Sequence, residues 1–219
     1  MALEVYWGSG SPFAWRVLLT LEVKKLAYES KLLEFSKGQH KSPDYLKMNP
    51  RGRVPTLKEG DFVLYESLAI MNYLDRKYPD VPNFGSTAEE VGFIWRHLTE
   101  GESYLRDPIS RMIAPLLFGQ ASEKAQEIRA AADTVHGELA GLEVTVAKSP
   151  WIAGSAVSAA DIAIFPFIQL LLRAAAKDGA KPLSLGFLPL NERYPRLAAW
   201  VKRVEALPGY ERTYPPHWK

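Results

Sequence analysis

The segment LEVYWGSGSPF, residues 3–13, decides how the chain begins to fold. It opens with a run of strand formers, and Ser11 followed by Pro12 is typical of a helix start, with serine as the N-cap and proline in the first turn. The exposed N–H groups and the dipole of such a helix start favour a bound anion. A dinucleotide-binding fingerprint would need a third glycine where Phe13 stands, so that motif is excluded.

Ser11 has two interpretations. In the first, its side chain only caps the helix by accepting a hydrogen bond from the first turn, which its position favours. In the second, its hydroxyl also donates to a bound anion, such as a thiolate.

Outward from this segment, strand and helix signals alternate as far as residue 80. The expected elements are a strand at 3–7, a helix at 11–25, a strand at 28–35, a short helix at 42–49, a hairpin of strands at 54–58 and 62–65, and a helix at 68–77 capped by Ser67. This order predicts an α/β domain with a small mixed sheet, in which a right-handed parallel βαβ unit precedes a hairpin and a helix.

Residues 81–87 contain proline and glycine and are expected to link this domain, residues 1–80, to a second domain of residues 88–219. All strong signals in the second domain are helical. Helices are expected at 87–115, at 120–147, from Ser158 onward, and, as the last one, from Tyr194–Pro195 onward. Two pairs have the spacing of a capping box, namely Thr87 with Glu90 and Ser158 with Asp161.

The composition is that of a globular protein, with 47% hydrophobic and 24% charged residues among 219. The net charge of +2 is spread without a basic block, which argues against a nucleic-acid partner. No apolar run reaches the ~18 residues that span a bilayer, and the first residues lack the pattern of a signal peptide, so the expected location is the cytoplasm. Because the chain has no cysteine, any sulfur chemistry must use the thiol of a ligand.

Three further segments could bind a ligand, and each also has a purely structural interpretation. A cis bond at Val54–Pro55 would turn the Val54 backbone outward toward a peptide-like ligand, whereas a trans proline would only mark an edge strand. Glu66–Ser67 is either another helix cap or a site where Ser67 binds a carboxylate and Glu66 an ammonium group. Residues 38–41 form either a solvated loop or a cationic clamp for a second carboxylate.

All four segments are expected to be loops at one end of the sheet. The histidines are far apart in the sequence and lack metal-ligand spacing, which argues against a metal site. They are His40, His97, His136 and His217.

The segments YWGSGSPFAWRVLLTLE, KGQHKSPDYLKMNPRGRVPTL and YESLAIMNYL closely resemble the N-terminal domain of cytosolic glutathione transferases. The segment WIAGSAVSAADIAIFP is similar to the capping-box helix of that family, so the resemblance covers essentially the whole chain. The opening YWGSGSP and the terminal YPPHW are most like the rho class, while KGQHKS and VPTLKEGDF are theta-like. The resemblance implies a thioredoxin-like N-terminal domain of βαβαββα order, an all-α C-terminal domain, and detoxification by conjugating the glutathione thiolate to hydrophobic electrophiles.

The resemblance also implies a source for the hydroxyl that binds the sulfur. Ser11 stands where the serine-type classes place it, and Ser9 is a nearby alternative. Tyr6 is the candidate if the chain follows the tyrosine-type classes, although it should lie within the strand. Asp161 would be a folding residue.

The rest of glutathione is expected to contact residues that match the family pattern. The cysteinyl part is assigned to the backbone of Val54 beside a cis Pro55, the γ-glutamyl end to Glu66 and Ser67, and the glycyl end to His40, Lys41 and Arg53. Arg53 stands where relatives often have lysine, which keeps the charge but changes the geometry.

Glutathione is the only co-substrate that the resemblance implies, with no permanently bound cofactor and no metal. The electrophile is expected between the first loop and the helical domain, against Phe13, Tyr104, Arg111, Met112 and Phe118. The resemblance also implies a homodimer, with no membrane or nucleic-acid partner.

Two other functions remain open. A glutathione-dependent isomerase of the zeta class usually has Ser-Ser-Cys before Trp-Arg-Val, and no cysteine stands there in this chain. A non-catalytic ligand carrier or interaction module of the same fold would tolerate loss of the glutathione contacts, yet the matching residues are present.

Overall fold

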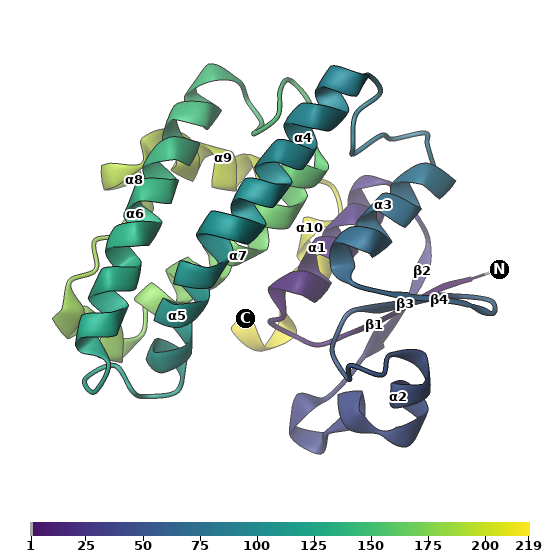
Figure 1. Cartoon of the computed structure of the whole chain (residues 1–219), viewed down its shortest axis with the longest axis horizontal. Coiled ribbons are helices and arrows are strands. Elements are labelled where there is room, and N and C mark those ends of the chain that lie inside the picture. The colour runs from purple at the N-terminus through teal and green to yellow at the C-terminus, as the bar shows by residue number, and fades with distance from the viewer. Residues whose placement is uncertain (1) are drawn as a thin grey trace. The chain divides into compact units, whose positions relative to one another are not determined.

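The computed structural model describes residues 2–219, which divide into two compact units (Figure 1). The first unit extends to Phe84 and also includes Ala206–Lys219, and the second is Gly85–Glu205. The sequence placed the boundary near residue 80 and assigned everything after residue 88 to the helical domain. The structure differs in giving the last residues of the chain to the first unit.

The first unit contains the expected order of strands and helices. Its elements are β1 (Leu3–Trp7), α1 (Pro12–Val23), β2 (Tyr28–Leu32), α2 (Pro43–Met48), β3 (Thr56–Glu59), β4 (Phe62–Tyr65), α3 (Ser67–Lys77) and α10 (Tyr210–Thr213). The sheet has the order β2-β1-β3-β4, with β1 parallel to β2 and antiparallel to β3. This confirms the predicted α/β class and the parallel βαβ unit followed by a hairpin.

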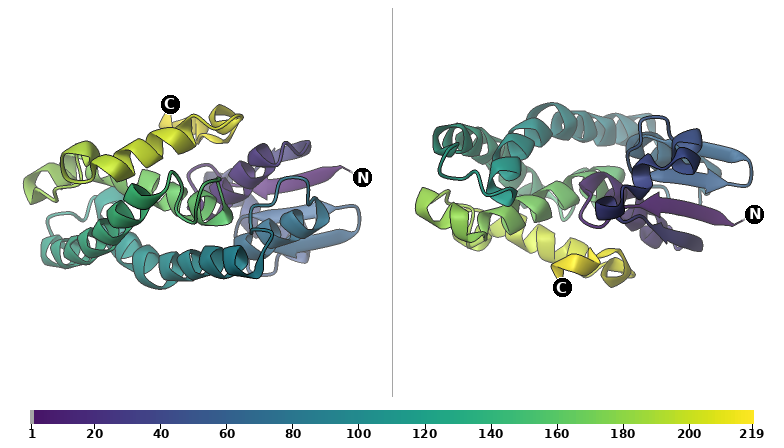
Figure 2. Two further views of the ribbon diagram at one scale, coloured as in Figure 1. Left: turned by 90° about the horizontal axis from the view of Figure 1, so that it is seen from above. Right: turned by 90° about the horizontal axis from the view of Figure 1, so that it is seen from below.

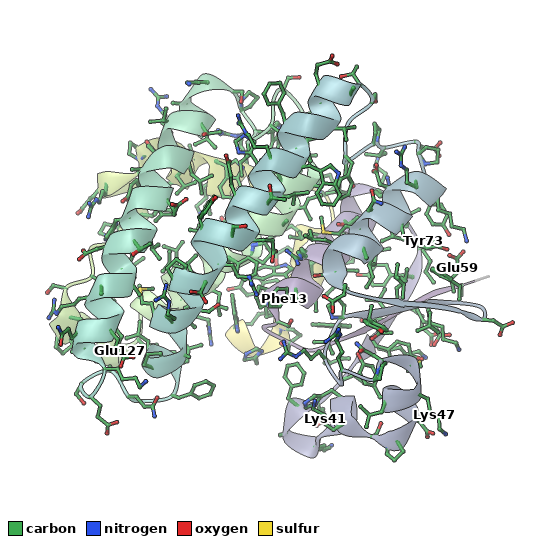
Figure 3. All side chains as sticks on the ribbon, viewed as in Figure 1. Phe13, Lys41, Lys47, Glu59, Tyr73 and Glu127 are labelled. Atoms are coloured by element: carbon green, nitrogen blue, oxygen red, sulfur yellow. The ribbon has the colours of Figure 1, made fainter. Side chains whose placement is uncertain are left out.

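The core of this unit forms where the sheet meets α1 and α3. Leu3, Val5 and Trp7 alternate along β1 and are all buried. Helix α1 packs against α3 and is buried on all sides from Ala14 to Glu22. In Figure 3, Glu59 at the end of β3 lies beside Tyr73 of α3, whose hydroxyl donates to it at 2.7 Å. These contacts hold α1 and α3 against the sheet.

Strand β2 is shorter than expected, because it ends at Leu32 and not at residue 35. The last β2 pairing joins Trp7 to Leu32, and β1 has no further residues to pair with. Phe35–Lys37 instead forms a short 3₁₀ helix, followed by a second one at Gln39–Lys41.

The C-terminal tail packs against α1, and this explains its place in the first unit. Arg212 donates to Glu22, and the Trp15 Nε1–H donates to Thr213 Oγ1 at 2.9 Å. Both views of Figure 2 show the yellow C-terminal segment beside the purple α1. The sequence analysis predicted that the helix beginning at Pro195 is the last element, and this was wrong because α10 follows it.

The second unit is helical. Its helices are α4 (Ala88–Glu100), α5 (Arg106–Leu117), α6 (Ala125–Lys148), α7 (Ala159–Ala175), α8 (Leu190–Arg193) and α9 (Pro195–Glu205). The expected single helix from residue 87 to 115 is interrupted by a π-helical turn, Gly101–Leu105. Pro108 accounts for this, because a helical proline clashes with the carbonyl four residues earlier and has no N–H to donate.

Helix α7 forms the centre of the helical unit and packs against α4, α5 and α9. Asp161 in its first turn is fully buried and accepts from the Ser158 N–H at 3.0 Å and the Ser158 hydroxyl at 2.9 Å. The Trp200 indole of α9 donates to the same carboxylate at 2.8 Å. The predicted capping pair is confirmed, and Asp161 also joins two helices.

Candidate active site

The connection from β1 to α1 is a tight turn that presents two serines. The Ser11 N–H donates to the Gly8 carbonyl at 3.2 Å, so Ser9 and Gly10 occupy the centre of the turn. Gly10 has φ of 81°, a conformation that favours glycine. The Ser11 hydroxyl oxygen accepts from the Ala14 N–H at 3.3 Å, which confirms its capping role. A hydroxyl that accepts in this way keeps its own hydrogen for another partner.

The C-terminal tail reaches this turn, a contact that the sequence did not predict. The Ser9 Oγ lies 2.5 Å from His217 Nδ1. The Trp218 indole N–H donates to His217 Nε2 at 3.0 Å. The signal available in the sequence was the concentration of aromatic residues in the last few positions, Tyr214, His217 and Trp218.

Tyr6, the alternative source of a hydroxyl for the sulfur, forms a hydrogen bond within its own strand. It lies within β1 and its hydroxyl donates to Glu4 Oε2 at 2.8 Å. Burial, with the neighbouring Glu4 carboxylate, raises the pKa of Tyr6 to about 12. A phenol engaged in this way has no hydrogen left for a bound sulfur, so the two serines are the remaining candidates.

The peptide bond between Val54 and Pro55 is cis. Within residues 2–219, the N–H and C=O of Val54 take part in no backbone hydrogen bond. The Arg53 carbonyl next to it is held by the Tyr45 hydroxyl at 2.6 Å and the Asn49 amide at 2.8 Å. Tyr45 and Asn49 therefore hold the backbone before Val54 in place, so that the Val54 N–H and C=O can pair with a peptide-like ligand. The sequence analysis did not identify these two residues.

Helix α3 begins without a side-chain cap. Glu66 is its N-cap residue, has φ of 70° and makes no capping hydrogen bond. Ser67 was expected to be the cap, but it is the first residue of the helix, and its hydroxyl accepts from the buried Arg16 Nε–H at 2.9 Å. The first turn of α3 therefore keeps the N–H groups and the dipole that attract a carboxylate.

The segment from residue 35 to 41 carries two of the expected cationic residues. The His40 ring packs on Phe35 at nearly a right angle, with ring centres 5.0 Å apart, and its buried Nδ1 has no hydrogen-bond partner within the described residues. The Lys41 Nζ donates to the Arg51 carbonyl at 3.3 Å, and Figure 3 shows Lys41 close to α2. Arg53 is exposed. The same unit therefore contains all of the residues expected to bind glutathione.

The residues expected to line the electrophile pocket come from both units. In the first unit, Phe13 lies in the opening turn of α1 with the Arg16 guanidinium 5.1 Å from its ring (Figure 3). In the helical unit, Tyr104 and Phe118 are highly exposed, at 60% and 79%. Met112 is fully buried there, so it belongs to the helical core and not to a pocket wall.

Arg111, the charged residue assigned to that pocket, forms an ion pair with Asp107 one turn away at 3.0 Å. Tyr104 lines a cavity of about 360 Å³ within the helical unit, together with Arg96, His97 and Glu100. Tyr104, one of the helical residues predicted from the sequence, thus borders a cavity.

The described part of the chain contains no cluster of three or more histidine, aspartate or glutamate side chains placed to hold a metal ion. Among residues 2–219, no helix is both long and apolar enough to cross a bilayer.

Two family models match the chain. The model described as "Glutathione S-transferase, N-terminal domain" matches residues 1–76, and the model "Glutathione S-transferase, C-terminal domain" matches residues 125–203.

Similar proteins are found among both curated sequences and solved structures. "Glutathione S-transferase A" of Pleuronectes platessa is 31% identical over 99% of this chain and 92% of its own length. "Glutathione S-transferase theta-2" of Homo sapiens is 31% identical over 99% of this chain and 86% of its own length. The crystal structure of a glutathione S-transferase from the Antarctic clam Laternula elliptica aligns with a TM-score of 0.83 and 33% identity, over 100% of this chain and 94% of that one.

Proposed function

The chain belongs to the glutathione S-transferase family, and we propose that a serine hydroxyl of its β1–α1 turn stabilises the glutathione thiolate for attack on hydrophobic electrophiles. The serine is Ser11 or Ser9. In a reaction with an aryl chloride, the sulfur forms a bond to the ring carbon, chloride leaves, and the thiol proton passes to solvent. The rho-like and theta-like class features remain predictions.

One observation supports the proposal most strongly: a single unit offers a partner for each part of glutathione. The open Val54 backbone suits the cysteinyl part, which is an amide with both a donor and an acceptor. The uncapped start of α3, with Ser67 and Glu66, suits the carboxylate and ammonium groups of the γ-glutamyl end. His40, Lys41 and Arg53 supply donors and positive charge for the glycyl carboxylate.

The energetics require only groups that this turn provides. A free thiol has a pKa of about 8.5, so only a few per cent is thiolate at neutral pH. Lowering that pKa by ~2 units corresponds to about 2.7 kcal/mol of preferential anion stabilisation. A hydrogen bond to a charged group contributes roughly 1.5–3 kcal/mol, and a helix start about 1 kcal/mol. One serine hydroxyl at the start of α1 is therefore sufficient.

We assign the electrophile to one half-buried apolar side chain of the first unit and to exposed side chains of the helical unit. Phe13 is the candidate in the first unit, and Tyr104, Arg111 and Phe118 are the candidates in the helical unit. A panel of aryl halides, epoxides, enals and organic peroxides tests which electrophile class is preferred.

The first experiment compares the wild-type chain with the Ser9→Ala/Ser11→Ala double variant. Glutathione affinity is measured by calorimetry, and turnover with an aryl halide. We expect wild-type binding and turnover, and at least a tenfold lower kcat in the double variant because the hydrogen bond to the thiolate is lost. Ser86→Ala, an exposed serine, is the matched control and should leave both unchanged.

The outcomes separate the alternative functions. Binding without turnover on any electrophile supports a ligand carrier, and cis–trans isomerisation of a maleyl-type diacid without conjugation supports a zeta-like isomerase. Absence of binding at millimolar glutathione contradicts the proposal.

We further propose that the protein is a cytoplasmic homodimer, as its family resemblance implies. Light scattering coupled to size-exclusion chromatography should report twice the chain mass of 24.6 kDa. A species of the single-chain mass contradicts the dimer.

A further inference from the structure

The last residues of the chain are held firmly beside the β1–α1 turn. The edge of one indole meets the face of the other where Trp218 packs on Trp15, with ring centres 5.4 Å apart. Tyr214 packs on the same Trp15 ring at 5.8 Å, and the Trp15 Nε1–H is bonded to Thr213. The tail is therefore anchored on α1 through several aromatic contacts, which fix the position of His217 between Trp218 and the turn.

The turn is built to accept this close approach. A Cβ atom added to Gly10 would lie 2.8 Å from His217 Cε1 and 3.3 Å from Trp218 Nε1, the first of which is closer than packed atoms tolerate. Gly10 also has a positive φ of 81°. Only glycine satisfies both the backbone geometry and the contact, so the turn and the tail fit each other at this residue.

The hydrogen bonds assign the tautomer of His217. An indole N–H can only donate, so His217 Nε2 accepts from Trp218 at 3.0 Å. A neutral imidazole whose Nε2 accepts carries its hydrogen on Nδ1, which then donates to Ser9 Oγ across 2.5 Å. Ser9 thus receives a hydrogen bond and keeps its own hydroxyl hydrogen for a further acceptor.

We propose that Trp218 and His217 are positioning residues that orient the Ser9 hydroxyl as the donor to the glutathione sulfur, an inference that rests on the proposed function. Successive hydrogen bonds polarise one another, so each donor strengthens the next along the series from Trp218 to Ser9. Ser11 keeps its observed task, which is to cap α1 through Ala14. The C-terminal tail is then part of the thiol site, although it is distant from it in the sequence.

The test measures the pKa of the thiol of bound glutathione, from the ultraviolet absorbance of the thiolate as pH is varied. Ser9→Ala and His217→Leu should each raise this pKa by about one unit, with a roughly tenfold loss of kcat, because the donor or its orientation is lost. Ser11→Ala should leave the thiol pKa near the wild-type value while lowering the unfolding midpoint.

Two variants separate orientation from packing. His217→Asn should restore the thiol pKa, since an asparagine amide N–H lies at about the distance of Nδ1 from the backbone and also donates. Trp218→Phe keeps an aromatic ring beside Trp15 and removes the indole donor, so it should raise the thiol pKa, but by less than His217→Leu does. A merely structural role for the tail would move the unfolding midpoint and not the thiol pKa.

The affinity for S-methylglutathione, which has no ionisable thiol, separates failure of the positioning role of the tail from failure of the proposed function. If all variants bind it like wild type and only the thiol pKa changes, the positioning role of His217 and Trp218 is supported. If the wild-type chain does not bind it, the proposed function fails. If the wild type binds and turns over, but His217→Leu leaves the thiol pKa unchanged or Ser11→Ala alone raises it, the positioning role is wrong and the proposed function stands.

Discussion

The starts of helices α3 and α7 each contain a serine and an acidic residue, Ser67 with Glu66 and Ser158 with Asp161, yet the two starts are built in opposite ways. At α7, the Asp161 carboxylate is fully buried and accepts from the Ser158 N–H and hydroxyl. At α3, the Glu66 side chain is 70% exposed and makes no capping bond, and its backbone has φ of 70°. The start of α7 is therefore sealed, which means that it is capped by side chains of the fold, whereas the start of α3 is open, which means that no side chain caps it.

This difference shows what each helix start contributes. A sealed start has its donors paired within the fold, so its residues act on stability. An open start keeps donors and dipole available for an anion, and a non-glycine residue held at positive φ is a strain that typically persists at functional sites. If this difference holds, substitutions at the start of α7 should lower stability without changing glutathione binding, and substitutions at the start of α3 should weaken glutathione binding.

The largest effect is expected for Asp161→Ala. The substitution leaves buried donors of Ser158, Ile152 and Trp200 without their acceptor, and we expect a loss of about 3–5 kcal/mol in the free energy of unfolding. Denaturant unfolding measures the loss, and the KM for glutathione should stay unchanged at temperatures where the variant is folded. The exposed Asp178→Ala provides the control, and equal losses in both would contradict a sealed start at α7.

The second prediction pairs Ser67→Ala with Ser158→Ala. Ser67→Ala removes a hydroxyl donor from the open start and the acceptor of Arg16, so the KM for glutathione should rise about tenfold, with a stability loss of about 1–2 kcal/mol. Ser158→Ala should cost a similar stability but leave the KM unchanged. If both serines affect KM equally, the two helix starts do not differ in function.

The smallest effect is expected for Glu66→Gly. Glycine adopts positive φ without strain, so the variant should gain about 0.5–1 kcal/mol in stability. Its KM for glutathione should nonetheless rise severalfold because the partner of the ammonium group is lost. Lys25→Gly is the matched control, since Lys25 has φ of 55° and no assigned contact with glutathione. Lys25→Gly should gain stability with no change in the KM for glutathione. A change in KM for Lys25→Gly would contradict the claim that the effect of Glu66 on binding is specific to the start of α3.

Sequence patterns predicted the elements of the first unit because those patterns are local. Alternating apolar residues, Ser-Pro helix starts and the hairpin turn each act over a few residues, and the structure has the predicted order of strands and helices. The helix cap of Ser11 and the capping pair of Ser158 with Asp161 were predicted for the same reason. The residues left the roles of Val54, Glu66 and Ser67 as one of two interpretations each, the resemblance favoured glutathione binding, and these roles remain predictions.

The errors of prediction came from contacts between segments far apart in the chain. Ser67 was predicted to be the N-cap of α3. Instead its hydroxyl accepts a hydrogen bond from Arg16 of α1, and the helix begins at Ser67, one residue earlier than predicted. Strand β2 ended when its partner β1 ended, which its own residues do not reveal. Met112 was predicted to line the electrophile pocket, but its side chain is fully buried in the core. Helical periodicity shows which residues share a face and not what packs against that face.

The sequence by itself determined the family, the order of elements and the candidate residues, since these depend on motifs and on local hydrogen bonding. Only the tertiary structure brought His217 and Trp218 to the turn that carries Ser9. That contact spans most of the chain, and it depends on how the C-terminal tail packs on α1, which no short-range pattern encodes.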